Sequence, residues 1–157
     1  MGTASLILPI LLPLLIMPLV LFPASRAMGL RLAPWAPLAG LILALTAPAD
    51  PHLDLPGVLL GTTLGLDDTG RLFLLFTALV WLLAGGFAHG WLRDDADKHL
   101  FWTFFLAAQA GNIGLCLAMD AASFYLLFAL MSFAAYGLVV HSGTVEALHA
   151  GRVYLAM

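Results

Sequence analysis

Charged residues are scarce in this sequence. Only 10% of its 157 residues are Asp, Glu, Lys or Arg, whereas 62% are hydrophobic, and the mean hydropathy is +1.03. A soluble domain has about a quarter of its residues charged, because it must cover its surface with groups that water solvates. The composition therefore excludes a soluble single-domain enzyme, and the surplus of apolar side chains predicts contact with a lipid bilayer.

Basic residues and cysteine are also too few for several functions. The 6 Lys and Arg residues form no cluster, which argues against a nucleic-acid partner, since such binding neutralises several phosphates. Cys116 is the single cysteine, so neither an internal disulfide nor a CxxC metal site is possible. No Ser-His-Asp, glycine-rich phosphate or His-Glu metal signature is present. We expect no catalytic residue, metal site or cofactor; at most the chain is a non-catalytic subunit of a membrane oxidoreductase complex.

Long apolar runs dominate the rest of the chain. A membrane crossing takes about 20 apolar residues. The runs predict an all-α, polytopic transmembrane bundle in a single domain over 1–157, with about five helices near 5–22, 28–47, 71–91, 100–119 and 121–141. The second run is the least regular, because it contains Pro34 and Pro37 and reaches full length only if Arg31 lies near its end.

The connections between these runs are polar. Residues 48–70 hold four acids and several Pro and Gly residues, so we expect a surface loop with an extended or hairpin segment over 53–66. Asp120 alone separates the fourth and fifth runs, which predicts a tight turn at the headgroups. Residues 142–152 are interpreted as a loop. The apolar residues 153–157 are interpreted as the start of a sixth helix, so the tail 142–157 leads into a further helix.

Lysine and arginine indicate the orientation, since they favour the cytoplasmic side. Five of the six Lys and Arg residues lie in the first connection, the third connection and the tail, which are expected on one side: Arg26, Arg31, Arg93, Lys98 and Arg152. Arg71, at the start of the third run, is the exception. This distribution predicts an integral protein of the bacterial inner membrane with its N-terminus, the loop 48–70 and Asp120 outside. Alternatively, the first run is a signal peptide with Ser25 and Ala27 before its cleavage point.

Uncharged polar residues are the remaining candidates for function within the runs. Gln109 and Asn112 are three residues apart and therefore share a helix face. Together with Ser132 and Tyr136 on the fifth helix, they are candidates for a proton or ion path. The alternative is that they form hydrogen bonds that hold helices together.

Two histidines give a second interpretation. His89 ends the third run and His141 ends the fifth, so both are expected at the cytoplasmic boundary. Such a pair has the minimum geometry for haem ligation, which would make the chain a cytochrome anchor. Histidine is also favoured at helix C-termini by the helix dipole, so a structural role remains open.

Four segments, in order, resemble motifs of a known family. They are Gly65 to Phe73 (GLDDTGRLF), Gly90 to Arg93 (GWLR), Leu117 to Asp120 (LAMD) and Phe128 to Tyr136 (FALMSFAAY). This pattern resembles the N-terminal part of the antiporter-like membrane subunits shared by respiratory complex I (NADH-quinone oxidoreductase), membrane-bound hydrogenases and multisubunit cation/proton antiporters. The resemblance implies proton or ion transport in a complex with sister membrane subunits.

One residue departs from the family pattern. The family has a mid-membrane glutamate on its fifth helix, and the matching position here is Ala129. In the family this glutamate is paired with a lysine on a later helix, and the charging of the pair drives proton movement. The departure leaves two interpretations besides the cytochrome anchor: a transport subunit that uses another group, and a structural or assembly subunit that does not transport.

Overall fold

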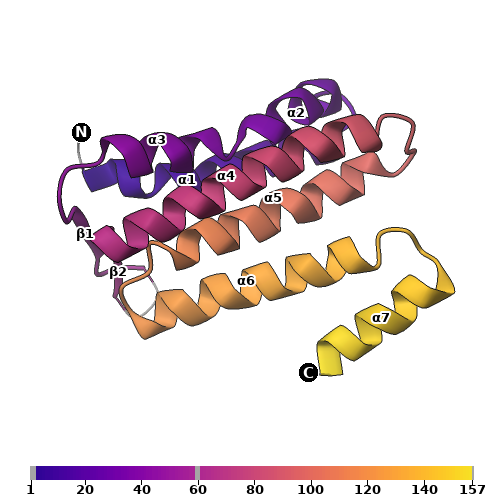
Figure 1. The fold of residues 1–157 in the computed structure, drawn as a ribbon. Coiled ribbons are helices and arrows are strands. Elements are labelled where there is room, and N and C mark those ends of the chain that lie inside the picture. Colours follow the sequence, from indigo (N-terminus) through magenta and orange to yellow (C-terminus); the bar gives the residue numbers. More distant parts are fainter. Residues whose placement is uncertain (1–2, 59–60, 157) are drawn as a thin grey trace.

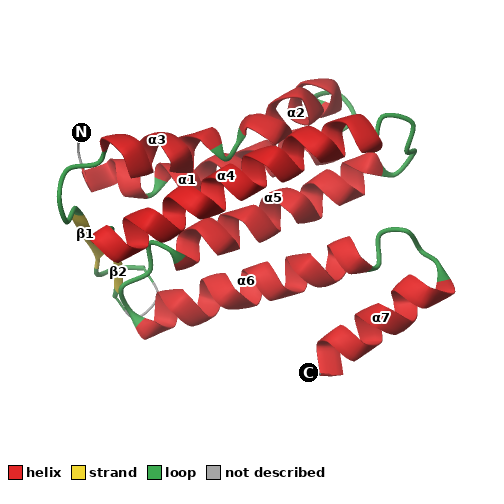
Figure 2. Cartoon of the chain, in the orientation of Figure 1, coloured by secondary structure: helices red, strands yellow, loops and turns green. Residues whose placement is uncertain are grey.

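The computed structural model describes residues 3–58 and 61–156, which are mostly helical (Figure 1). The elements, in chain order, are η1 (Thr3–Leu6), α1 (Leu8–Leu21), α2 (Arg26–Leu32), η2 (Ala33–Trp35), α3 (Leu38–Thr46), β1 (His52–Leu55), β2 (Thr62–Gly65), α4 (Asp68–Trp91), α5 (Lys98–Leu115), α6 (Ala121–Val139) and α7 (Val145–Ala156). The two strands form an antiparallel hairpin at one end of the bundle (Figure 2).

The chain runs back and forth along one axis. We name its ends by their residues: the hairpin end holds β1, β2 and the turn 116–120, and the basic end holds Arg26, Arg31, Arg93 and Lys98. Helices α1, α4 and α6 run from the hairpin end to the basic end, and α3, α5 and α7 run back (Figure 1). Four of the six Lys and Arg residues therefore lie at one end, whereas Arg152, expected with them, lies on α7.

The described residues contain three helical segments long and apolar enough to cross a membrane. They are Arg26–Thr46, which includes α2, η2 and α3, followed by Asp68–Trp91 and Ala121–Val139. Helix α1 is apolar but has 14 residues, and α5 has 18. These three segments support an integral membrane protein, whereas the expected count of about five crossings is not confirmed.

The second crossing is broken, where a single helix over 28–47 is expected. Helix α2 passes into the 3-10 turn η2, and α3 starts after Pro37. Pro34 and Pro37 have no amide hydrogen and cannot continue the α-helical bonding pattern. Gly85 of α4 packs against this break, because a Cβ there would lie 3.3 Å from the Pro34 Cα and carbonyl oxygen.

Helix α5 ends earlier than the expected residue 119. After Leu115 the chain makes a turn at 116–117, and residues 117–119 then bond to β2: Gly65 N–H donates to Leu117 O at 2.8 Å, and Met119 N–H donates to Thr63 O at 2.9 Å. These bonds satisfy backbone groups that a helix would otherwise pair. The prediction of purely helical structure therefore fails here, while the hairpin falls, apart from His52, within the segment 53–66 expected to be extended.

The tail also differs from the prediction. Residues 145–152, expected to be a loop, belong to α7, which folds back beside α6. Gly151 permits this contact, because a Cβ there would lie 2.5 Å from Val140 Cγ1 and 2.9 Å from Tyr136 Cε2.

Helix α5 forms the centre of the molecule and packs mainly against α6 and α1. At the hairpin end, Leu6 and Leu117 belong to one cluster of buried apolar side chains. At the basic end, Val20 and Trp102 belong to another. By contrast, α4 exposes large apolar side chains along its length: Phe73, Phe76, Val80, Leu83 and Phe87. Lipid or other membrane helices are the surroundings that suit such a face.

Candidate functional site

Gln109 lies in the middle of α5 with its side chain 0% exposed. Neither its Nε2 nor its Oε1 has a hydrogen-bond partner among the described residues. A buried amide without partners costs free energy, so its presence needs an explanation such as bound water or function. Gln109 is the most unusual polar residue of the bundle for this reason.

Proline in α1 adds a second unusual feature at the same level. Leu6 shares one buried cluster with Leu117, and Val20 shares the other with Trp102, so the antiparallel helices α1 and α5 place Gln109 about level with Pro13. Pro13 lies inside α1 and is fully buried. It has no amide hydrogen to donate to the carbonyl four residues earlier. The middle of the bundle therefore combines an unpartnered amide with an interrupted backbone ladder.

Asn112 lies one turn further along α5 and joins three helices. Its Oδ1 accepts a hydrogen bond from Trp81 Nε1 of α4 at 3.0 Å. Its Nδ2 donates to Met131 Sδ of α6 at 3.1 Å. Trp81 is held in turn by an edge-to-face contact with Phe105, whose ring centroid is 4.7 Å away. Although Gln109 and Asn112 are three residues apart, Asn112 has partners and Gln109 has none.

A groove of about 360 Å³ leads from the hairpin end toward Asn112. It lies between α4 and α5, and its lining residues are Asp67, Thr69, Gly70, Phe73, Thr77, Asn112, Leu115 and Cys116. The Thr77 hydroxyl and the Cys116 thiol lie 3.7 Å apart within it. The groove thus brings polar side chains from the bundle surface to Asn112, in the last turn of α5.

Ala129, Ser132 and Tyr136 lie away from this groove. The face of α6 that meets α5 contains Leu127 and Met131, because a Cβ at Gly111 would lie 2.7 Å from Leu127 O and Met131 N. Ala129 follows Leu127 by two residues and is therefore turned about 200° from that face. Ser132 and Tyr136 share this far side with Ala129. The structure thus separates the predicted path residues into a pair on α5 and a group on the opposite side of α6.

The two histidines at the basic end have different surroundings. His141 Nε2 lies 3.3 Å from Asp95 Oδ2, and its ring packs edge-to-face on Phe101. A hydrogen bond from Asp97 N–H and the nearby His141 lower the pKa of Asp95, although burial acts in the opposite direction. His89 instead lines cavities with Arg31 and Lys98. The described residues contain no group of three His, Cys, Asp or Glu side chains that could hold a metal ion.

Asp120 has a larger structural role than a tight turn requires. Its Oδ1 accepts from Ser123 N–H at 2.8 Å, which caps α6, and its Oδ2 accepts from Thr63 N–H of β2 at 2.9 Å. These amide donors lower the pKa of its carboxyl group. The spacing Asp120 to Ser123 is a helix N-cap pattern that the sequence contains. The bond to Thr63, 57 residues away, has no such local signal.

Comparison with known proteins gives a partial match. The chain is similar to the D subunit of a Na(+)/H(+) antiporter of Bacillus subtilis (strain 168), with 28% identity over 158 residues. The match covers 95% of this chain and 32% of the relative, so the chain spans about a third of the length of the protein it matches. No protein-family model matches the chain. This weak similarity and the apolar helices support an antiporter-like integral membrane subunit.

Proposed function

We propose that the chain forms the N-terminal part of an antiporter-like subunit in a multisubunit cation/proton antiporter. The observation that carries the proposal is the similarity to the Bacillus subtilis antiporter subunit, which extends over 95% of the chain. Its expected partners are sister membrane subunits, which would pack against the exposed apolar faces of α4 and α6. A complex I or hydrogenase subunit remains the second candidate, on the motif order in the sequence.

The orientation belongs to the same proposal. With the basic end in the cytoplasm, the N-terminus and the hairpin end lie outside the bacterial inner membrane. The gathering of Arg26, Arg31, Arg93 and Lys98 at one end supports this placement. Cysteine labelling tests it: in a Cys116→Ala background, an impermeant reagent added outside should modify Val58→Cys and spare Ala96→Cys. Both positions are exposed, so the opposite pattern overturns the orientation.

The proposed contribution of this part is to pack the membrane module and to admit water or protons. The groove, Asn112 and Gln109 form the candidate polar route from the hairpin end. The coupling carboxylate is absent at Ala129, and the middles of α1, α3, α4, α5 and α6 contain no Asp, Glu, Lys or Arg. The charge that drives transport would therefore reside on other segments or subunits.

Ala129 also favours another candidate, a structural subunit that does not transport. One experiment separates this scaffold function from a contribution to transport. A strain that lacks the chain should lose sodium tolerance, and the wild-type chain should restore it. If the chain acts only as a scaffold, Asn112→Leu with normal assembly should restore tolerance fully. If it contributes a route, this variant should assemble and yet transport less.

A further inference from the structure

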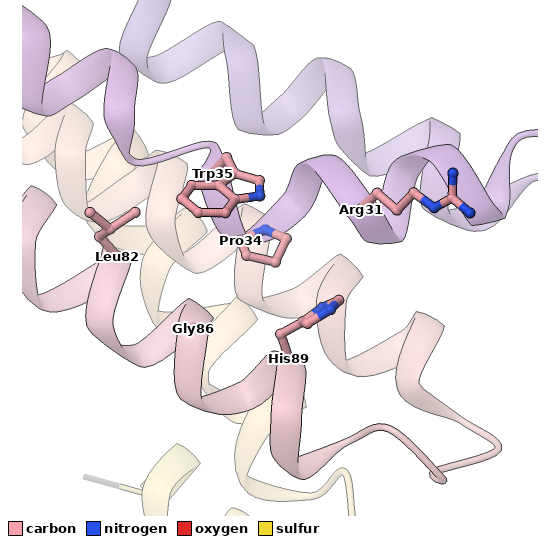
Figure 3. Close-up of a pocket in the computed structure, with 6 residues that line it drawn as sticks. All are labelled: Arg31, Pro34, Trp35, Leu82, Gly86 and His89. Atoms are coloured by element: carbon pink, nitrogen blue, oxygen red, sulfur yellow. The ribbon is translucent and has the colours of Figure 1, made fainter.

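Two adjoining cavities occupy the basic end of the bundle. The larger, of about 390 Å³, lies between the broken helix and α4 and is lined by Arg31, Pro34, Trp35, Leu82, Gly86 and His89 (Figure 3). The second, of about 230 Å³, is lined by Leu30, His89, Leu92, Arg93, Lys98 and Trp102. His89 lines both cavities, so a single elongated molecule can contact the two sets of residues.

The charge around these cavities is positive. Arg31, Arg93 and Lys98 line them, and no carboxylate of the described residues does. The ion pair found in the described part of the chain joins His141 and Asp95, which leaves Arg31 and Arg93 without a carboxylate partner there. The acids Asp94, Asp95 and Asp97 lie in the neighbouring connection and offset part of this charge. An anionic group is the ligand that these cations suit.

The wall of the larger cavity is apolar and open. Leu82 and Pro34 face it, and Gly86 leaves a hollow on α4 between Leu82 and His89 (Figure 3). A Cβ built at Gly86 meets no atom within 4 Å, in contrast to the tight contact of Gly85 with Pro34. Trp35 at the rim is 60% exposed, and tryptophan is enriched at the headgroup level of membranes.

We propose that this double cavity binds an anionic phospholipid. The phosphate lies near His89, between Arg31 and Arg93, and an acyl chain follows Leu82 and the hollow at Gly86. Basic pockets between membrane helices suit acidic headgroups in this way. A lipid is favoured over a soluble anion because the cavity adjoins the exposed apolar side chains of Leu83 and Phe87 on α4. The site requires only that the bundle lies in a membrane and does not depend on transport.

Native mass spectrometry of the full chain in detergent tests the proposal. Phosphatidylglycerol should remain bound under conditions that remove phosphatidylcholine. Arg31→Gln combined with Arg93→Gln should reduce binding, by about fivefold for each guanidinium lost. Arg152→Gln, which removes an exposed charge of α7, is the matched control and should change nothing. Equal binding of the two lipids overturns the proposal.

A second pair of variants tests the hollow without altering charge. Gly86→Leu fills the cavity and should lower phosphatidylglycerol binding, whereas Ala84→Leu, on another side of α4, should leave it unchanged. Retention of binding in Gly86→Leu overturns the assignment of the acyl chain. Inorganic phosphate added at millimolar concentration should not displace the lipid; displacement would show a phosphate site and contradict the lipid assignment.

Discussion

The two faces of α6 differ in what they contact and in the side chains they present. The face toward α5 is close-packed: Gly111 of α5 meets the α6 backbone, and Gly137 of α6 meets the Phe104 ring. The far face has Ala129, Ser132 and Tyr136, and it also exposes Tyr125 and Phe133. Helix α7 covers this face near Tyr136. Position 129 is therefore on the side of α6 that faces surroundings beyond the described bundle.

The difference between the two faces of α6 explains why the predicted path residues fall into a pair on α5 and a group on α6. Polar groups on α5 can interact with α1, α4 and the near side of α6. A carboxylate at position 129 would point away from them, toward whatever covers the far face. Changes at position 129 and changes at Gln109 and Asn112 can therefore be tested separately.

Filling the close-packed face should have the largest effect. In Gly111→Leu the new Cβ would meet Leu127 O and Met131 N at 2.7 Å, and backbone atoms cannot move aside as a flexible side chain can. We expect the free energy of unfolding to fall by about 3 kcal/mol. Thermal unfolding in detergent measures it. Ala129→Leu on the far face is the control, expected to change stability by no more than about 0.5 kcal/mol; equal losses would contradict the packing difference.

A carboxylate placed at position 129 tests the far face directly. If Ala129 faces lipid or a dry interface, Ala129→Glu costs about 2.5 kcal/mol. We expect less assembled protein in the membrane and no gain in proton flux, measured with a pH-sensitive dye in proteoliposomes. Ala129→Gln controls for side-chain size. A well-assembled Ala129→Glu protein with greater flux than the parent would instead show that the far face lines a polar route.

Breaking the attachment of α6 to the hairpin should have a smaller effect. Asp120→Ala removes both the helix cap and the bond to Thr63, so we expect a lower melting temperature. Because its folded pKa is lowered, the Asp120 carboxylate stabilises the protein fully above its unfolded pKa of about 3.9 and loses this effect as the pH falls through the folded pKa. The difference between wild type and Asp120→Ala should therefore be constant above about pH 5 and should shrink as the pH falls below about 3.9.

Asp120→Asn is the matched variant, because it keeps one acceptor oxygen and can still cap α6. Its melting temperature should lie between those of the wild type and Asp120→Ala. A pH-independent difference between wild type and Asp120→Ala would contradict the role of the charged carboxylate.

These elements also show what the sequence determines. Uninterrupted apolar runs located α4 and α6 because a span-length run has few alternatives. Pro34 and Pro37 predict an irregular second helix from the sequence, but the close packing of Gly85 against Pro34 is not predictable from it. The end of α5 depends on pairing with β2, and α7 mixes Glu146, His149 and Arg152 with apolar residues, so neither is determined locally.

The candidate site is likewise predictable within one helix and not between helices. Helical spacing relates residues on one helix, and it placed Gln109 and Asn112 near each other. It does not specify which neighbouring helix each meets. Trp81 and Met131, the partners of Asn112, come from α4 and α6, and the separation of Ala129 from this pair depends on the rotation of α6 that packing at Gly111 sets.

The smallest expected effect concerns Gln109. Gln109→Met keeps the length of the side chain and removes both unpartnered polar atoms, so it should stabilise the bundle by about 1 kcal/mol. The measurement is thermal unfolding, with Asn112→Leu as the contrasting variant, which loses two bonds and should destabilise. If Gln109→Met destabilises as well, a bound water already satisfies the amide, because only a satisfied group loses interactions on removal. If Gln109→Met is instead more stable and transports less, Gln109 is a polar group of the proposed route that lowers the stability of the bundle.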